Sequence, residues 1–345
     1  MMKMFLLLVL LMSPVAAFAG EKLIFAIDII RHGDRMPVDD IPKSPYKWPL
    51  PFGQLTPKGM KQEYDLGSKA RAEYVERYHL LAPNYVSGTM YIRSSDVDRT
   101  LMSAQSFLTG LYPHGTGPEL DGKPALPDFA QPIPIHTVAA AEEDLLFPDG
   151  PQYKFRELRE KYVSPTPQWQ QKKAQVEPNL ARWSEATGLS LKKLEDLIPL
   201  GNTLAIYRLY NVEPPKELTD KDVQEIIEAG QWAFLAEFGA EEVGRRTGMA
   251  LLKQVSGRIR DAADGKNGLK YVLFSAHDST LMSEMSALGA PLGATPPYAS
   301  RLNFSLFDTG DKNFAVKVTY NDTPVAVKGC GPASCTLEQF MTLIK

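Results

Sequence analysis

The sequence predicts an α/β fold with a mostly parallel central sheet flanked by helices and an inserted, mainly helical cap lobe. The segment 23–30 is short, apolar and β-branched, as strands covered on both faces are, and 89–95 and 270–276 are further strands. Each strand leads through a charged turn into a segment with helical character. From about 151 to 239 the chain is instead helical and rich in Glu, Lys, Gln and Trp, which predicts the lobe.

The first unit runs from the strand at 23–30 into a charged loop and then a helix. Thr56 is a good N-cap, because its hydroxyl can accept a bond from a free backbone N–H. Pro57 follows at the first helical position, where its missing N–H is not needed. We therefore expect a long helix that begins at Pro57 and continues to about residue 79.

The second unit consists of the strand at 89–95 and a helix over 96–112. Two acidic residues stand at the start of this helix. Because aspartate is a favoured N-cap, we expect Asp96 or Asp98 to cap it.

The third unit lies near the end of the chain. The strand at 270–276 is followed by a His-Asp turn and by a helix over 279–289 that Gly289 closes. The segment 301–320 alternates apolar and polar residues around a turn, which predicts an antiparallel hairpin at the sheet edge.

Length and charge limit the possible functions. The chain has 345 residues, of which 44% are hydrophobic and 23% charged, so it is globular. Its formal net charge of -3 leaves no basic surplus for a nucleic-acid backbone, so we expect no nucleic-acid partner and only local anion binding. The expected organisation is one domain over 20–345 with the cap lobe inserted at about 151–239.

The first 19 residues predict a cleaved signal peptide. A lysine, an apolar run and the small residues before Gly20 fit the pattern, and the run is shorter than the roughly 20 residues that a membrane anchor needs. We expect a secreted or periplasmic protein without a membrane span. In an exported chain, Cys330 and Cys335 predict a short-loop disulfide; metal ligation is less favoured because no histidine is nearby.

The charged turns after the three strands predict the functional site. They read RHGDR at 31–35, DVDR at 96–99 and AHD at 276–278. Ligands of parallel α/β sheets bind outside the carboxyl ends of the strands, so we expect these turns to meet in one crevice. The candidate residues there are Arg31, His32, Arg35, Arg99, His277 and Asp278.

These residue types favour phosphoryl transfer. Guanidinium groups match phosphate oxygens with paired donors and stabilise the charge of the transition state. Cationic neighbours disfavour protonation of a nearby imidazole, which keeps it available as a nucleophile in acid. Asp278 can then protonate the departing alkoxide.

Several motifs together resemble the histidine acid phosphatases, branch 2 of the histidine phosphatase superfamily, most closely those of the prostatic and lysosomal type. The matching segments are RHGDRMP, PFGQLTPKGM, YIRSSDVDRTLMSA, QPIPIHT, FSAHDSTL, PPYAS and GCGPASCTLEQF. The resemblance implies an acid phosphatase that acts on small phosphate monoesters without a metal or other cofactor. It implies that His32 is the phosphorylated nucleophile and Asp278 the proton donor. The phosphate-binding residues that it implies are Arg31, Arg35, Arg99 and His277.

Other functions stay open on the sequence alone. Within the family, the chain could be a phytase-like or sugar-phosphate-specific enzyme, and the lobe is the segment that follows the family pattern least clearly. Asp34 either orients the loop or forms a structural salt bridge. Outside the family, a phosphate-binding module is disfavoured because both reactive residues are present. A metallo-phosphoesterase is disfavoured because three arginines would repel the cation; its ligands would be His32, Asp34, His277 and Asp278.

Overall fold

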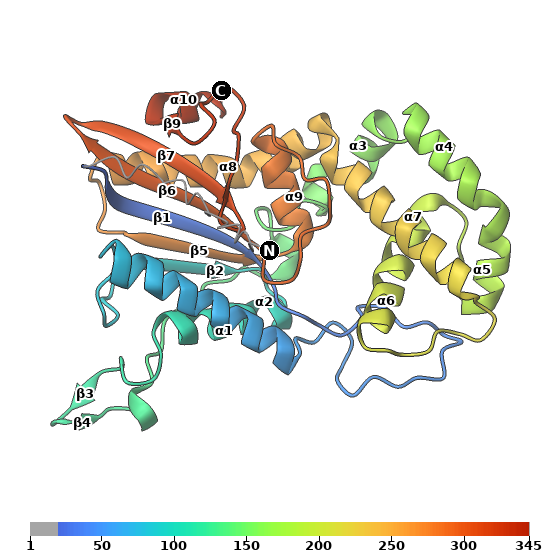
Figure 1. Cartoon of the computed structure of the whole chain (residues 1–345), viewed down its shortest axis with the longest axis horizontal. Helices are drawn as coiled ribbons and strands as arrows, with labels where there is room; N and C mark the ends of the chain where they lie inside the picture. Colours follow the sequence, from blue (N-terminus) through green and yellow to red (C-terminus); the bar gives the residue numbers. More distant parts are fainter. Residues whose placement is uncertain (1–19, 345) are drawn as a thin grey trace, which may run out of the picture.

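The computed structural model describes residues 20–344, so the signal peptide predicted at 1–19 lies outside the described residues. Figure 1 shows a sheet with helices on both faces and a group of helices beside it. The helices α1 (Pro57–Arg71) and α2 (Asp98–Leu111) cover one face. The other face carries α8 (Glu241–Ala263), α9 (Asp278–Ala287) and α10 (Leu337–Thr342). The predicted α/β fold is confirmed.

The main sheet has seven strands in the order β2-β5-β1-β6-β7-β8, with β9 paired to β7. At its centre, β2, β5 and β1 run parallel, whereas β6 and β7 are antiparallel to their neighbours. The sheet is therefore parallel where the three predicted units meet. The strands are β1 (Lys22–Arg31), β2 (Met90–Ser94), β5 (Tyr271–Ala276), β6 (Arg301–Gly310), β7 (Asn313–Tyr320), β8 (Thr323–Pro324) and β9 (Cys335–Thr336).

The predicted hairpin is formed by β6 and β7, and the short strands β8 and β9 pair with the outer edge of β7. The predicted disulfide joins Cys330 to Cys335 and closes the loop that leads into β9. A separate two-stranded hairpin, β3 (Glu119–Leu120) with β4 (Lys123–Pro124), projects from the body of the protein in Figure 1.

The helix boundaries confirm some predictions and correct others. The Thr56 hydroxyl accepts a bond from Gly59 N at 3.0 Å, as expected of the N-cap of α1. The α-helix ends at Arg71, earlier than predicted, and the chain continues as the π-helical segment η1 (Ala72–Arg77). Gly289 has a φ of +74° just beyond α9, so it ends that helix as predicted.

The prediction that Asp96 or Asp98 caps α2 is wrong. Val97 is the N-cap residue and makes no side-chain capping bond, while Asp98 is already the first helical residue. Instead, a hydrogen bond between two hydroxyl groups holds the turn between β2 and α2, because Ser95 Oγ and Thr100 Oγ1 lie 2.8 Å apart. The turn predicted at His277 and Asp278 is likewise part of a helix start, because His277 is the N-cap of α9.

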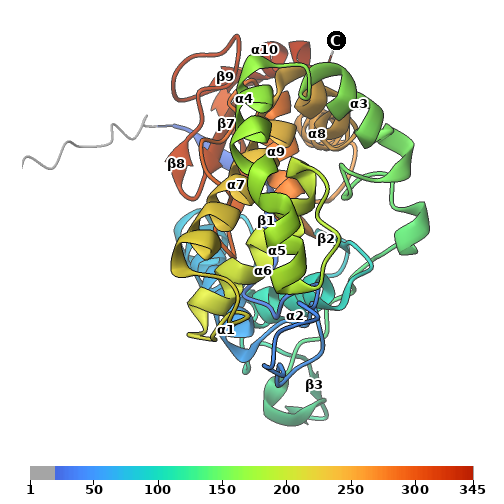
Figure 2. The same cartoon turned by 90° about the vertical axis from the view of Figure 1, so that its right-hand side faces the viewer.

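Helices α3 to α7 stand beside the sheet in Figure 1 and face the viewer in Figure 2. They share one apolar cluster, which also takes in Ile41, partly buried Trp48 and Val243. The limits of 151 and 239 for the cap lobe stay a prediction. The helices are α3 (Phe155–Tyr162), α4 (Pro167–Val176), α5 (Leu180–Thr187), α6 (Leu197–Leu209) and α7 (Asp220–Gly239). None of the helices within 20–344 is long and apolar enough to cross a membrane.

Glycines allow α1 and α2 to pack with their backbones in close approach. A Cβ added to Gly67 would lie 1.9 Å from the carbonyl oxygen of Phe107, far below any real contact distance. A Cβ added to Gly110 on α2 would lie 2.1 Å from the carbonyl oxygen of Tyr64. The close packing of α1 on α2 therefore positions the start of α1, with Thr56 and Gly59, beside the carboxyl end of β1.

We predict that Gly67→Ala lowers the free energy of unfolding by about 1–3 kcal/mol, because the added methyl group must push the two helices apart. Gly257→Ala in α8 is the matched control, since nothing lies within 4 Å of a Cβ at Gly257. There the better helix propensity of alanine should raise stability by up to about 1 kcal/mol. Urea denaturation measures the free energy of unfolding of both variants. Equal changes in that free energy at Gly67 and Gly257 would contradict the packing argument.

Candidate active site

The three charged turns meet at one edge of the sheet, as predicted. In the parallel pairing, Arg31 at the end of β1 lies opposite Ala276 of β5, and Ser94 of β2 lies opposite Ser275. The turns that follow these strands therefore leave the sheet side by side. All six predicted residues come together there: Arg31, His32, Arg35, Arg99, His277 and Asp278.

The loop after β1 packs tightly against α1 and α2. A Cβ added to Gly33 would lie 2.4 Å from the carbonyl oxygen of Gly59, so only glycine fits. Gly33 N also donates to Ser103 Oγ at 3.1 Å. These contacts hold the backbone on either side of His32.

His32 is oriented by its own loop. Its Nδ1 lies 2.8 Å from the carbonyl oxygen of Gly33, which can only accept, so Nδ1 carries the proton in the neutral ring. The lone pair is then on Nε2. Burial, with the charges of Arg31, Arg99 and Arg35 and the nearby His277, holds the pKa of His32 well below its usual value. The His32 ring is therefore neutral even in acid, and its free lone pair could act on a ligand.

Each of the three arginines is held by a different partner. Arg31 Nη1 donates to the carbonyl oxygen of Pro296, and Arg35 Nη2 donates to Asn202 Oδ1 at 2.9 Å. Arg99 Nη2 lies 3.4 Å from His277 Nδ1. Burial, Arg35 and Arg31 lower the pKa of Arg99 to about 10, so it remains a cation at neutral and acid pH.

The three arginines concentrate positive charge in a buried place. Their Nε atoms are buried, and none of them has a hydrogen-bond partner among residues 20–344. What sets these three arginines apart is that they lie close enough together to act on one another and on His32, and such a concentration of positive charge favours an anionic ligand rich in acceptor oxygens. A phosphate group would satisfy these donors and balance their charge.

His277 belongs to a short chain of hydrogen bonds. Arg99 can only donate, so His277 Nδ1 accepts and the proton is on Nε2, which lies 2.9 Å from Ser95 Oγ. Ser95 in turn lies 2.8 Å from Thr100 Oγ1. Burial, together with Arg99, lowers the pKa of His277 to about 3. This ring is therefore neutral and orients Arg99.

Asp278 is the first residue of α9, and both carboxylate oxygens have partners. Oδ1 accepts from Ser279 N at 2.9 Å, and Oδ2 lies 2.7 Å from Arg31 Nη2. Burial acts to raise the pKa of Asp278, but Arg31 and Arg35 outweigh it and hold the pKa below its usual value. In this arrangement Asp278 is an anion paired with Arg31.

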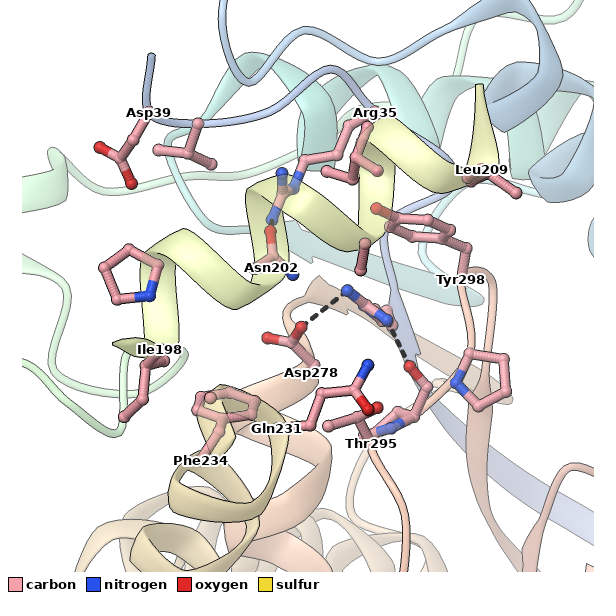
Figure 3. Close-up of a pocket in the computed structure, with 18 of the residues that line it drawn as sticks. Arg35, Asp39, Ile198, Asn202, Leu209, Gln231, Phe234, Asp278, Thr295 and Tyr298 are labelled. Atoms are coloured by element: carbon pink, nitrogen blue, oxygen red, sulfur yellow. Dashed lines mark hydrogen bonds and ion pairs between the residues drawn. The ribbon is translucent and has the colours of Figure 1, made fainter. Parts of the chain in front are cut away.

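A cavity of about 660 Å³ opens in front of Arg31, Arg35 and Asp278 (Figure 3). Helices α6 and α7 form its opposite wall, which is largely apolar and includes Ile198 and Phe234. The site thus joins a cationic end on the sheet to an apolar wall on the helices beside it.

Sequence analysis missed three side chains of the site. Asn202, within α6, and Tyr210, just beyond its last residue, contact the loop after β1, and no local motif indicates either of them. Tyr298 faces Arg31, and the only signal for it was its place in the PPYAS segment.

Asp34 forms no salt bridge within the described part of the chain. Its Oδ2 accepts from Thr56 Oγ1 at 2.6 Å and from the Tyr210 hydroxyl, and it is fully buried. Of the two roles considered from the sequence, this geometry favours orientation of the loop, because the carboxylate ties it to α1 and to the end of α6.

The amino-acid sequence is similar to those of known proteins. The family described as histidine phosphatase superfamily (branch 2) matches residues 22–321. Lysosomal acid phosphatase of Xenopus laevis is 35% identical over 361 residues, covering 99% of this chain and 80% of the relative. Human prostatic acid phosphatase is 33% identical over 342 residues, covering 94% of this chain and 85% of the relative.

Solved structures show the same fold at lower identity. The phytase of Citrobacter braakii has a TM-score of 0.66 and 16% identity, covering 94% of this chain and 97% of that one. The complex of Hafnia alvei phytase with myo-inositol hexakis sulphate gives the same TM-score, identity and coverage.

We predict that neither His32 nor His277 takes up a proton between pH 7 and pH 5, because burial and the arginines depress both pKa values. Imidazole NMR signals, assigned with His32→Ala and His277→Ala, should therefore stay constant over this range. Titration of either ring near its usual value of about 6.5 would contradict the electrostatic account.

Proposed function

The chain belongs to branch 2 of the histidine phosphatase superfamily and is an acid phosphatase, and from this premise we propose that it works through a phosphohistidine on His32. One observation carries the proposal: a neutral, buried His32 lies beside three arginines, and one of these, Arg31, is paired with Asp278 at 2.7 Å. A nucleophile and an oxyanion site are thus supplied by neighbouring side chains.

The arginines bind the phosphoryl group and stabilise its transition state. Arg31, Arg35 and Arg99 supply donors for the non-bridging oxygens, whose charge must be stabilised as the ester bond breaks. His277 keeps Arg99 directed at the site through its Nδ1 contact of 3.4 Å. Because these groups are held before substrate arrives, little reorganisation is needed during the reaction.

In the first half-reaction, the lone pair of His32 Nε2 attacks phosphorus while the bond from phosphorus to the ester oxygen breaks. The proton of Asp278 passes to that oxygen, so an alcohol leaves and an Asp278 carboxylate remains. In the second half-reaction, water attacks the phosphohistidine and gives its proton to Asp278. Inorganic phosphate leaves, and neutral His32 and protonated Asp278 are regenerated.

Substrate binding prepares Asp278 for its role. Before binding, Asp278 is paired with Arg31 at 2.7 Å, which favours its anion. A phosphate group takes over Arg31 and cancels its positive charge, so the pKa of Asp278 rises. Acid pH then favours the protonated form that can donate, and the rate falls as rising pH removes that proton.

The same cationic cluster supports a reaction without a metal. Three guanidinium groups already supply the positive charge that a metal would provide, and they would repel a cation. Activity should therefore persist in excess EDTA, and vanadate, which imitates pentacoordinate phosphorus, should inhibit. Loss of activity in EDTA that zinc or iron restores would contradict this part of the proposal.

The cavity favours a monoester with an apolar or uncharged alcohol over a polyphosphate. Beyond the arginines, Lys58 is the one cation that lines it in the described structure, and the helical wall is largely apolar. The likeness to the phytase structures supports the fold, but a substrate with many phosphates would lack partners on this wall.

We propose that the protein is exported. The residues before Gly20 have the pattern of a signal peptide, and the Cys330–Cys335 disulfide suits an oxidising compartment. The relatives named lysosomal acid phosphatase also support a location outside the cytosol.

We predict that His32→Ala abolishes turnover, because both ring nitrogens of His277, the neighbouring imidazole, already have partners in Ser95 and Arg99. Rapid quench with labelled substrate should trap an acid-labile, base-stable phosphoenzyme in the parent. His277→Ala is the control: it should retain some activity and still form the adduct. An adduct of the same kind in His32→Ala would show that the nucleophile is a different residue.

We predict that Asp278→Ala loses far more rate on an alkyl phosphate, such as glycerol phosphate, than on p-nitrophenyl phosphate. A basic alkoxide needs the proton to leave, whereas p-nitrophenolate needs little help. The measurement is kcat/KM over phosphates of graded leaving-group pKa. Equal losses at every leaving group would mean that Asp278 binds or orients and that another group donates the proton.

A further inference from the structure

Tyr298 lies on the loop between α9 and β6, and the proposed reaction does not yet use it. The centre of the Arg31 guanidinium is 4.4 Å from the centroid of the Tyr298 ring, a cation–π distance. The same ring lies 5.9 Å from the ring of His32. Figure 3 shows Tyr298 on the rim of the cavity, with its hydroxyl directed toward Arg35.

The backbone of this loop is tied to the same two residues. Arg31 Nη1 donates to the carbonyl oxygen of Pro296, and Arg31 N donates to the carbonyl oxygen of Ser300 at 2.9 Å. Ala299 N donates to the carbonyl oxygen of His32 at 3.3 Å. The loop therefore holds both ends of Arg31 and the nucleophile's backbone.

The residue after Tyr298 has an unusual conformation. Ala299 has a φ of +56°, in the left-handed region that side chains other than glycine rarely adopt. Such strain persists only where the surroundings impose it, and it concentrates at functional sites. Here the bonds to His32 and Arg31 impose it, and they bring the ring of Tyr298 over the guanidinium.

Arg31 has a particular need for such support. Its Nη2 is paired with Asp278 at 2.7 Å, and a bound phosphate must replace that partner. During the exchange, the carbonyl oxygen of Pro296 and the Tyr298 ring are the contacts that stay. The ring also shields the guanidinium, whose side chain is 7% exposed, from water that would weaken its attraction to phosphate.

We propose that Tyr298 is a positioning residue, whose ring keeps Arg31 in place while Arg31 changes its partner from Asp278 to the phosphoryl group. This inference rests on the proposed function, because it assumes that phosphate binds at Arg31. It assigns the effect to the aromatic ring rather than to the hydroxyl. Tyr298 therefore acts on every substrate alike, through Arg31, whatever the leaving group.

The test measures binding of inorganic phosphate, which has no leaving group. Tyr298→Leu should raise the inhibition constant of phosphate roughly tenfold, because Arg31 loses its aromatic support. Tyr298→Phe should change it less than about twofold, since the ring remains. If Tyr298→Leu does not fold, Tyr298→Met, which has a flexible side chain, replaces it and should raise the inhibition constant of phosphate by the same factor.

Phe234→Leu is the matched control. Phe234 lines the same cavity from α7, and its ring packs on that of Phe238, with 5.1 Å between the ring centroids. Its loss should alter KM for substrates with large leaving groups and leave the inhibition constant of phosphate unchanged. A rise in that constant equal to the rise in Tyr298→Leu would overturn the assignment to Arg31.

A double-mutant cycle with Arg31→Met tests the route of the effect. Where residue 31 carries no guanidinium, Tyr298→Leu should change the inhibition constant of phosphate less than about twofold. A full tenfold effect in the Arg31→Met background would show that Tyr298 acts by another route and would overturn the inference.

The outcomes separate this inference from the proposed function. If the parent binds phosphate and vanadate and Tyr298→Leu binds them equally well, only the role of Tyr298 is overturned. If Tyr298→Phe raises the inhibition constant of phosphate as much as Tyr298→Leu does, the assignment of the effect to the ring is overturned. If the parent binds neither anion and forms no phosphoenzyme, the proposed function itself fails, and the inference fails with it.

Discussion

The repulsion among three guanidinium groups in one crevice is the constraint on which the site depends. Burial together with charge from the other arginines lowers the pKa of both Arg35 and Arg99. Such a cluster persists only if each member is held separately and an anion balances the charge. The carbonyl oxygen of Pro296, Asn202 and His277 hold the three side chains, and Asp278 supplies the anion in the structure. Burial and the same charges together lower the pKa of both histidines and keep them neutral.

The fold produces this cluster by simple means. Parallel pairing of β2, β5 and β1 brings three turns to one edge, and each turn contributes one or two charged groups. Close approach at Gly33 and Gly59 then lets the first turn lie flat against α1. A bulkier residue at either position would push away the backbone that carries His32. Small residues in the scaffold are thus as necessary to the site as the charged ones.

The helices beside the sheet contribute to both binding and position. Helix α6 reaches the loop after β1 twice, through Asn202 on Arg35 and through Tyr210 on Asp34. It also forms part of the apolar wall of the cavity that Arg31, Arg35 and Asp278 line. The helix that shapes the cavity therefore also helps to hold Arg35 and Asp34, which carry the proposed phosphate site. A change in α6 would affect leaving-group preference and phosphate binding together.

The sequence by itself determined the three strand-to-helix units, the hairpin, the disulfide and the six charged or imidazole residues that meet. These features follow from local patterns, because an apolar run, a helix cap or a charged turn depends only on residues that are neighbours in the sequence. The meeting of the turns then follows because parallel strands end at the same edge of the sheet. The start of α2 was predicted wrongly. Neither Asp96 nor Asp98 caps it, and a hydrogen bond between the hydroxyl groups of Ser95 and Thr100 holds the turn instead. Only the tertiary structure decided the partners of the site residues. Asn202 is 167 positions from Arg35, and its role depends on how α6 packs beside the sheet, which no local pattern encodes.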